Sequence, residues 1–290
     1  MSYDIRDKAA LTPMEILDLN FIRKPGACVF RKHFRAGLRS HITELLSRED
    51  VIRETRGEVI HGVRRFHGAK PEWILRIFRK RFSSLDQVLE DIDKYKLVLK
   101  FLGPDRIARS NEFVVDYLLD GTPHIVLCGL QEYIDGEILD PWGLYGTGYL
   151  ADLFDRMPYP DNCRGDRVST AVQSIDTFVE RTRKMISESG FIPDLAGIGN
   201  LLLTPEGTLK LVDINNIVPI SRDDSIPIDD KGYPSCDKSV ETLAILETKI
   251  LSRPIPGDDP LYGIFLQPDR KKQVLELERA FYESLRTQSE

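Results

Sequence analysis

The chain has 290 residues, a mass of 33.1 kDa and a composition that is 41% hydrophobic and 30% charged, as in ordinary globular proteins that bury a sizeable core. No apolar run approaches the ~20 residues that cross a bilayer, and the first 15 residues lack the apolar centre of a signal peptide. Four scattered cysteines without a CxxC pair argue against a zinc ribbon, so we expect a cytoplasmic protein with reduced thiols.

The net charge of −6 is unevenly distributed along the chain. Residues 1–110 hold 23 Lys and Arg against 15 Asp and Glu, a balance of +8 that leaves −14 for the remainder. A basic first part can complement phosphates, but a solvated amphipathic surface explains the dispersed arginines equally well. No nucleic-acid-binding motif accompanies them, so we expect no nucleic-acid partner.

We expect residues 1–50 to form an N-terminal extension. Thr12 and Glu15 are the residue types that favour a helix cap and first turn. Residues 26–30 are typical of a short strand, and residues 40–50 are typical of the start of a helix.

We expect residues 51–134 to form a β-rich part. Alternating apolar and polar residues and strong turn chemistry predict most of its elements, and one segment has helical periodicity after a capping Ser84. In chain order these are a hairpin, a strand, a helix and two further strands, at residues 51–66, 72–82, 84–103 and 113–136.

We expect residues 135–290 to be mainly helical. Apolar residues at helical spacing predict three helices, and a short apolar hairpin interrupts them. The helices are expected at residues 170–190, 237–251 and 269–286. Strands first and helices afterwards indicate an α+β fold.

The hairpin is the most informative segment, in the sequence FIPDLAGIGNLLLTPEGTLKLVDINN. Two apolar segments are joined by a turn at residues 205–207, which places Asn200 and Asp213 side by side at one end of the hairpin. Asp194 lies six residues before Asn200. Carboxylate and carboxamide oxygens grouped in this way suit Mg²⁺ and phosphate.

This segment resembles the catalytic and metal-binding loops of the protein-kinase-like superfamily, which has H-x-D, an Asn five residues later, and D-F-G thirteen residues after the Asn. The spacing from Asn200 to Asp213 matches. Asp194 is one residue too far from Asn200, Ile192 stands in the place of the His, and D-I-N replaces D-F-G. The order of elements over residues 51–251 is also similar to that family, and implies a bilobal fold with a β-rich N-lobe and a mainly helical C-lobe.

The resemblance implies a role for each matching residue. Asp194 would be the catalytic base, and Asn200 and Asp213 would hold Mg²⁺. Arg76 stands where the family has its phosphate-binding strand lysine, and Glu90 on the following helix would be its partner. Alternatively, Asp194 braces its loop and Arg76 is a strand residue that reaches solvent.

Other residues complete the implied nucleotide site. Gly57 and Gly62 match the outer glycines of a G-x-G-x-x-G loop, although a simple β-hairpin explains them equally well. Backbone groups near Glu132 and Ile134 would bind adenine at the hinge between lobes; a buried strand that ends in a turn is the alternative. Two further lysines are fallback candidates for the phosphate-binding cation, Lys80 and Lys32.

The sequence therefore predicts an ATP- and Mg²⁺-dependent phosphotransferase that acts on a hydroxyl acceptor, more readily a small molecule, sugar or lipid than a protein. The absence of an A-P-E segment after Asp213 favours this class of acceptor. Two alternatives remain open: a catalytically impaired pseudokinase that binds nucleotide or protein, and nucleotidyl transfer on the same fold. The acceptor pocket would come from residues 137–190 and the C-terminal helices, and the sequence specifies no oligomeric state.

Overall fold

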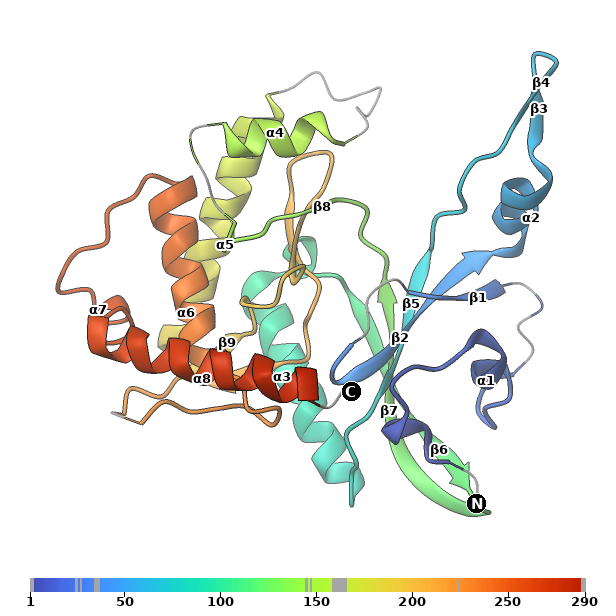
Figure 1. Cartoon of the computed structure of the whole chain (residues 1–290), viewed down its shortest axis with the longest axis horizontal. Coiled ribbons are helices and arrows are strands. Elements are labelled where there is room, and N and C mark those ends of the chain that lie inside the picture. The colour runs from blue at the N-terminus through green and yellow to red at the C-terminus, as the bar shows by residue number, and fades with distance from the viewer. Residues whose placement is uncertain are drawn as a thin grey trace. The chain divides into compact units, whose positions relative to one another are not determined.

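The computed structural model describes residues 3–23, 26, 28–33, 37–143, 146, 148–157, 166–223 and 225–287. The fold is mixed α+β, with 40% helix and 23% strand (Figure 1). The chain divides into two compact units. Unit 1 comprises residues 1–93 and 109–133, and unit 2 comprises residues 94–108 and 134–290. Helix α3 (Leu85–Leu102) contributes its first half to unit 1 and its second half to unit 2.

Unit 1 is built on a five-stranded antiparallel sheet with the order β1-β2-β5-β7-β6. In that order the strands are Cys28–Lys32, Ser40–Ser47, Trp73–Phe78, Thr122–Glu132 and Ser110–Leu119. Strands β6 and β7 form the predicted hairpin, and its turn residues Asp120 and Gly121 have φ angles of 50° and 79°. Positive φ at both central residues is the geometry that matches the twist of a two-residue hairpin.

The expectation of a helix beginning at residue 40 is wrong, because residues 40–47 form strand β2, which lies between β1 and β5 in the sheet. Both faces of β2 are largely covered, so its sequence lacks the polar alternation that identifies a half-exposed strand. Helix α2 (Arg48–Arg56) begins only after Ser47, whose hydroxyl accepts a hydrogen bond from the Asp50 amide. Strands β1 (Cys28–Lys32) and β2 (Ser40–Ser47) therefore belong to the sheet of unit 1 and not to a separate extension.

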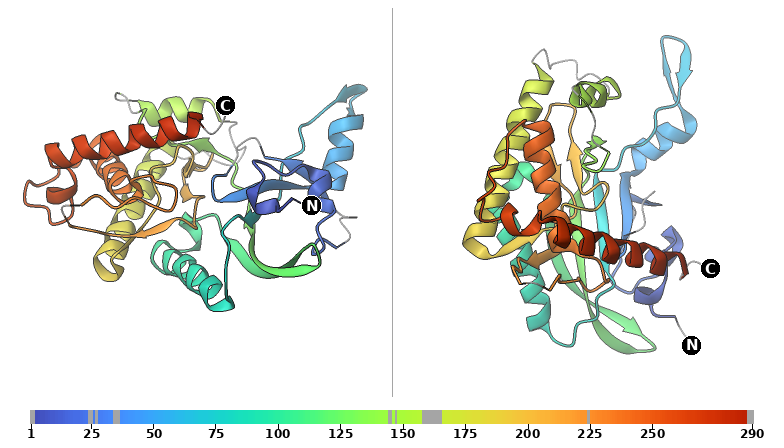
Figure 2. Two further views of the ribbon diagram at one scale, coloured as in Figure 1. Left: turned by 60° about the horizontal axis from the view of Figure 1, so that its bottom comes forward. Right: turned by 60° about the vertical axis from the view of Figure 1, so that its left-hand side comes forward.

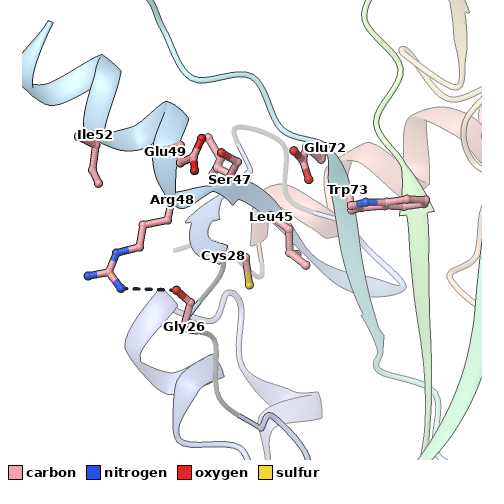
Figure 3. A pocket seen from close by; sticks show the side chains of 10 residues that line it. Gly26, Cys28, Leu45, Ser47, Arg48, Glu49, Ile52, Glu72 and Trp73 are labelled. Atoms are coloured by element: carbon pink, nitrogen blue, oxygen red, sulfur yellow. Dashed lines mark hydrogen bonds between the residues drawn. The ribbon is translucent and has the colours of Figure 1, made fainter.

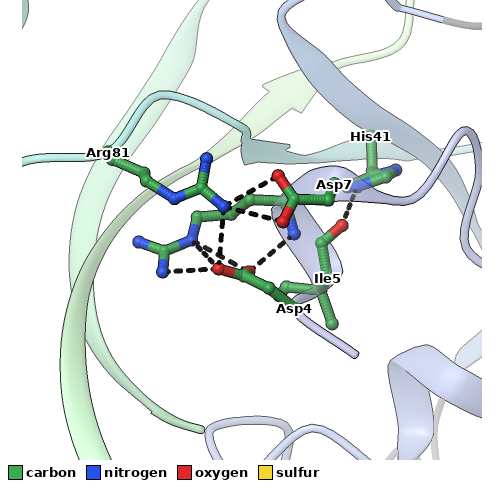
Figure 4. Close-up of polar contacts among 6 residues, drawn as sticks. Asp4, Ile5, Asp7, His41 and Arg81 are labelled. Atoms are coloured by element: carbon green, nitrogen blue, oxygen red, sulfur yellow. Dashed lines mark hydrogen bonds and ion pairs between the residues drawn. The ribbon is translucent and has the colours of Figure 1, made fainter. Parts of the chain in front are cut away.

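The first residues of the chain cover one face of this sheet. They form a short 3₁₀ helix, η1 (Ile5–Asp7), and α1 (Pro13–Leu17), which has the predicted capping box between Thr12 and Glu15. Buried His41 on β2 hydrogen-bonds through Nε2 to the Ile5 carbonyl, 2.7 Å away (Figure 4). The apolar side chains buried on this face are Ile5, Leu11, Ile16, Leu19, Phe30, Leu75, Ile77, Tyr117, Val126 and Cys128.

Two arginines hold Asp4 and Asp7 at the edge of this covered face (Figure 4). Arg6 Nη2 lies 2.7 Å from Asp4 Oδ2, and Arg81 Nη2 lies 3.2 Å from the same oxygen and 2.7 Å from Asp7 Oδ1. Burial alone would raise the pKa of Asp4, but the hydrogen bonds and charge of Arg6, with a further hydrogen bond from Arg81, lower it to about 2. Asp4 therefore stabilises the fold as a carboxylate.

The lowered pKa of Asp4 predicts a pH-dependent loss of stability in Asp4→Asn. Because the folded-state pKa lies below the unfolded value, the contribution is complete at neutral pH and is lost as the pH falls from about 4 through about 2. We expect Asp4→Asn to lose about 2 kcal/mol of unfolding free energy at pH 7 in urea titrations, and less at pH 3. Exposed Asp18→Asn is the control; an equal deficit for Asp4→Asn at both pH values would contradict the assignment.

The opposite face of the sheet packs on the first half of α3 through Val88, Phe78, Phe82 and Leu127. The hairpin predicted at residues 51–66 is shorter than expected: residues 51–56 belong to helix α2, and only β3 (Glu58–Ile60) and β4 (Val63–Arg65) form it. In the described part of the chain, these two strands make a separate two-stranded sheet. Figures 1 and 2 show this hairpin and α2 projecting from the end of the sheet of unit 1.

Unit 2 is mainly helical, and its central helix α5 (Arg167–Ser189) is buried along one side. Asp166 caps the start of α5, and Gly190, with φ 73°, ends it as predicted. The other helices are η2 (Pro104–Arg106), α4 (Tyr149–Asp155), α6 (Ser235–Ile245), its π-helical continuation η3 (Leu246–Ile250), α7 (Tyr262–Phe265) and α8 (Pro268–Thr287). No helix in the described part of the chain is long and apolar enough to cross a membrane.

The strands of unit 2 form two small sheets. The first has the order β11-β10-β8, and the second pairs β12 with β9. Their bounds are β8 Glu137–Ile138, β9 Phe191–Pro193, β10 Leu201–Leu203, β11 Leu209–Leu211 and β12 Ile217–Pro219. The loops between these strands carry the residues of the predicted metal and base site.

Candidate functional site

The hairpin of β10 and β11 brings Asn200 and Asp213 to the same end, as the sequence predicted. Leu201 pairs with Leu211, and the Val212 amide donates to the Asn200 carbonyl at 2.8 Å. Asp213 is the next residue along the chain. Apolar side chains that face the core of unit 2 set this register, because slipping by one residue would turn them outward.

The carboxamide of Asn200 is held by its own loop. Its Nδ2 donates to the Asp194 carbonyl at 3.0 Å, which leaves its Oδ1 as the atom able to bind a metal. A Cβ on Gly197 would lie 2.7 Å from both Nδ2 and Oδ1 of Asn200, so only glycine lets the carboxamide occupy this place. Gly199, with φ 90°, supplies the turn into β10.

Asp194 is buried, with 7% of its surface exposed, and both carboxylate oxygens accept hydrogen bonds within unit 2. Oδ1 accepts from the Ala196 amide at 2.9 Å, and Oδ2 accepts from Asn216 Nδ2 at 2.8 Å. The Asp194 amide also donates to the Asn216 carbonyl at 2.8 Å. Asn216 therefore holds Asp194 through its backbone and its side chain, and so links the residue to the loop that carries Asp213.

Two further groups that the sequence did not identify brace the loop. Ser239 Oγ on α6 accepts from the Leu195 amide at 3.1 Å, and Trp142 Nε1 donates to the Ala196 carbonyl at 2.9 Å. Lys238 Nζ lies 3.8 Å from the centre of the Trp142 ring. The signal in the sequence for Ser239 was the group of four polar residues at the start of α6, Ser235, Asp237, Lys238 and Ser239, all of which are buried.

Tyr233 lies in the same region of unit 2. Burial, the neighbouring carboxylate of Glu278 and, more weakly, Asp194 raise the pKa of its hydroxyl well above the ordinary value. The hydroxyl donates to Glu278 Oε1 at 2.8 Å. Tyr233 is thus a neutral hydrogen-bond donor, and it is unsuited to act as a base near neutral pH.

Arg76 in unit 1 is buried on β5, the third strand of the sheet in chain order. Its Nη1 donates to Gln131 Oε1 at 3.1 Å, and its guanidinium lies 5.1 Å from the centre of the Phe78 ring. It therefore does not reach solvent as a plain strand arginine would.

The expected partner of Arg76, Glu90, is exposed on α3. Val88 and Ile92 of α3 pack against the sheet. Glu90 lies two residues from each, and residues two apart on a helix face different directions. The helical periodicity that predicted α3 was therefore sufficient to exclude Glu90 from the face of α3 that packs on the sheet.

Gly57 and Gly62 do not lie in the five-stranded sheet. Gly57, with φ 69°, ends α2, and Gly62, with φ 79°, is in the turn of the projecting β3–β4 hairpin. A Cβ on Gly57 would lie 2.8 Å from Arg64 Cγ and 3.0 Å from the Phe66 ring. Positive φ accounts for both glycines, and close packing is a second reason at Gly57, which favours the simple hairpin over a phosphate-binding loop.

At the predicted hinge, the backbone amide of Glu132 donates to the Arg109 carbonyl at 2.8 Å, and its carboxylate lies 3.1 Å from Arg109 Nε. Ile134 is half-buried and begins the second segment of unit 2. A Cβ on Gly136 would lie 2.5 Å from the Leu203 carbonyl oxygen, so this glycine allows the chain to pass close to β10.

The two lysines that were alternative candidates for the phosphate-binding cation, Lys80 and Lys32, are not buried in the sheet as Arg76 is. Lys80 pairs with Asp91 on α3 at 2.7 Å, and Lys32 is exposed on β1. Of the stretch expected to form the acceptor pocket, residues 144, 145, 147 and 158–165 lie outside the described part of the chain.

The donor set at Asn200 and Asp213 fits a magnesium ion in chemical type. One carboxylate and one carboxamide are hard oxygen ligands, and Mg²⁺ commonly takes only one or two such protein ligands and completes its shell with water and phosphate. No group of three His, Cys, Asp or Glu suited to a metal occurs within the residues the structure describes. These two residues would therefore hold the ion only together with a phosphate ligand.

One cavity of about 500 Å³ lies in unit 1, beside the start of α2 (Figure 3). Apolar side chains and the carboxylates of Glu49 and Glu72 line it. None of the residues predicted for nucleotide, metal or base chemistry lines this cavity. Its described lining consists of Gly26, Cys28, Leu45, Leu46, Ser47, Arg48, Glu49, Ile52, Glu72 and Trp73.

Comparison of the chain with protein-family models and with curated protein sequences gave no match.

Proposed function

We propose that this protein is an ATP- and Mg²⁺-dependent phosphotransferase with a kinase-like bilobal fold. The observation that carries the proposal is the arrangement in unit 2: a hairpin places Asn200 and Asp213 at one end, and Asn200 is hydrogen-bonded to the backbone of Asp194. Unit 1 adds a cation, Arg76, on the third strand of an antiparallel sheet, and a helix follows that strand. Kinases carry their phosphate-binding lysine in this position.

The proposed reaction transfers the γ-phosphoryl group of ATP to a hydroxyl. The acceptor oxygen forms a bond to the γ-phosphorus while the bond to the β-phosphate oxygen breaks, and ADP leaves. Asp194 takes the proton of the acceptor hydroxyl. Asn200 and Asp213 would hold Mg²⁺, which would neutralise phosphate charge, and the resemblance implies that Arg76 is a phosphate-binding cation. Small-molecule, sugar or lipid hydroxyls remain the favoured acceptors.

A second candidate function is nucleotide binding without turnover, as in a pseudokinase. The burial of Asp194 favours it, because both carboxylate oxygens already accept hydrogen bonds from Ala196 and Asn216. An acceptor hydroxyl would have to share one of these oxygens. Nucleotidyl transfer on the same fold is a third candidate, and its leaving group, pyrophosphate instead of ADP, distinguishes it.

The test is a thermal melt of the full chain with millimolar ATP, with and without Mg²⁺. We expect a rise in melting temperature that requires Mg²⁺, because a ligand well above its Kd stabilises the state that binds it. Slow release of ADP then supports phosphoryl transfer, release of pyrophosphate supports nucleotidyl transfer, and release of neither supports the pseudokinase. No Mg²⁺-dependent rise would overturn all three.

A further inference from the structure

A buried polar cluster lies on the face of the unit 1 sheet that packs against α3. It includes Arg76, Gln131 and Ser110, of which 6%, 5% and 9% are exposed. In the strand register, Gly129 on β7 pairs with Arg76 on one side and with Glu112 on the other. Residues paired across antiparallel strands point to the same face, so the side chains of Arg76 and Glu112 flank Gly129 on this face.

The missing side chain of Gly129 creates the space that Glu112 occupies. A Cβ on Gly129 would lie 2.7 Å from Glu112 Oε2 and 2.9 Å from Ser110 Oγ. The Glu112 carboxylate therefore lies over Gly129, one strand spacing of about 4.8 Å from the strand that carries Arg76. Both carboxylate oxygens are shielded from solvent. A carboxylate buried in this way is stable when a cation neutralises it.

We infer that Glu112 is the positioning carboxylate of Arg76, in the role that the kinase resemblance gave to Glu90. Gln131 fixes the guanidinium from one side at 3.1 Å, and Glu112 fixes it from the strand beyond Gly129. The cation is then oriented by two side chains of its own sheet.

The identity of residue 76 follows from this arrangement. A planar guanidinium has five N–H donors in a fixed fork, so one edge can donate to an amide oxygen while another faces a carboxylate. A lysine ammonium is a point charge without that fork. Arginine is therefore suited to bridge Gln131 and Glu112, where lysine would have to choose between them.

The pairing is tested first by stability, which does not depend on any activity. Thermal midpoints are measured for Glu112→Gln, Arg76→Gln and the double variant. We expect the double variant to melt above both single variants, because each single change leaves one buried charge without its partner. Losses that add, so that the double variant melts lowest, would overturn the pairing.

Gly129→Ala provides a second measurement if a single variant does not fold. Its new Cβ would displace the Glu112 carboxylate. We therefore expect it to lower the melting temperature more in the wild-type background than in Glu112→Ala, where the obstructing carboxylate is absent. Equal losses in the two backgrounds would count against the proposed position of Glu112.

The positioning role rests on the proposed function and is tested by nucleotide affinity, with Glu90→Gln as the matched control. We expect Glu112→Gln to weaken the apparent Kd for Mg²⁺–ATP at least tenfold and Glu90→Gln to change it less than twofold. The reverse order would return the role to Glu90 and overturn the inference. A wild-type chain that binds no nucleotide would refute the proposed function, and the role of Glu112 with it, whereas the melting experiments would still decide the pairing.

Discussion

Asp213→Asn should abolish the Mg²⁺-dependent part of nucleotide binding. The substitution keeps the size of the side chain and removes the one full negative charge in the predicted donor pair. Without it, the amide oxygens of two neutral side chains would have to compensate for the charge of the metal, and Mg²⁺ gives up its water for such ligands reluctantly. We expect the increase in melting temperature produced by Mg²⁺–ATP, measured against the same variant without ligand, to disappear.

The control for this experiment is Asp230→Asn, which removes a carboxylate that is mostly exposed in the same unit. We expect this variant to keep the full response to Mg²⁺–ATP. If Asp213→Asn also responds fully, the metal does not bind at this end of the hairpin. That result would remove the observation on which the proposed function depends.

Asp194→Asn should lower turnover by about two to four orders of magnitude, the range expected when a general base is lost. Nucleotide affinity should remain, because Asn200 and Asp213 are unchanged. The substitution should also destabilise unit 2. A carboxamide offers one acceptor oxygen, whereas the Ala196 amide and the Asn216 side chain both donate to Asp194. One buried donor would lose its partner, at a cost of about 1–3 kcal/mol.

The double variant Asp194→Asn with Asn216→Asp separates these two effects. It exchanges the donor and the acceptor across the 2.8 Å contact, so the hydrogen bond can form again with the opposite polarity. We expect it to recover part of the lost stability in urea titrations and none of the lost turnover. Recovery of turnover would show that either position can carry the base. If the single variant keeps full turnover, Asp194 is a structural residue.

Interactions between residues close in the sequence determine a large part of this fold, and these parts could be predicted. The capping box at Thr12, the hairpin turn at Asp120 and Gly121, and the end of α5 at Gly190 were all recognisable because each depends on a few neighbouring residues. The hairpin that ends in Asn200 and Asp213 was predictable for the same reason. Two short apolar strands and a tight turn leave only one register that buries their leucines.

Strand β2 could not be predicted from its own residues, which indicated the start of a helix. Its neighbours β1 and β5 are brought to it by the sheet, and the covering segment comes from the start of the chain. A strand covered on both faces carries no alternation of polar and apolar residues, so its sequence resembles a buried helix. The hydrogen bonds that hold Asp194 and its loop could not be predicted from the sequence for a similar reason. Their partners, Asn216, Ser239 and Trp142, come from three segments that are distant in the sequence.

The sequence by itself therefore determined the mixed α+β class, most helices, the turns of three hairpins, and the placement of Asn200 and Asp213 at one end of the last hairpin. The tertiary structure decided which residues surround the candidate catalytic groups. It placed Arg76 beside Gln131 and across Gly129 from Glu112, with Glu90 exposed, and it set Asp194 against Asn216. The physical reason is the sequence distance over which each interaction acts. Capping, turns and periodicity depend on a few neighbouring residues. The contacts around Arg76 and Asp194 depend on strand register and on burial by segments that are distant in the sequence.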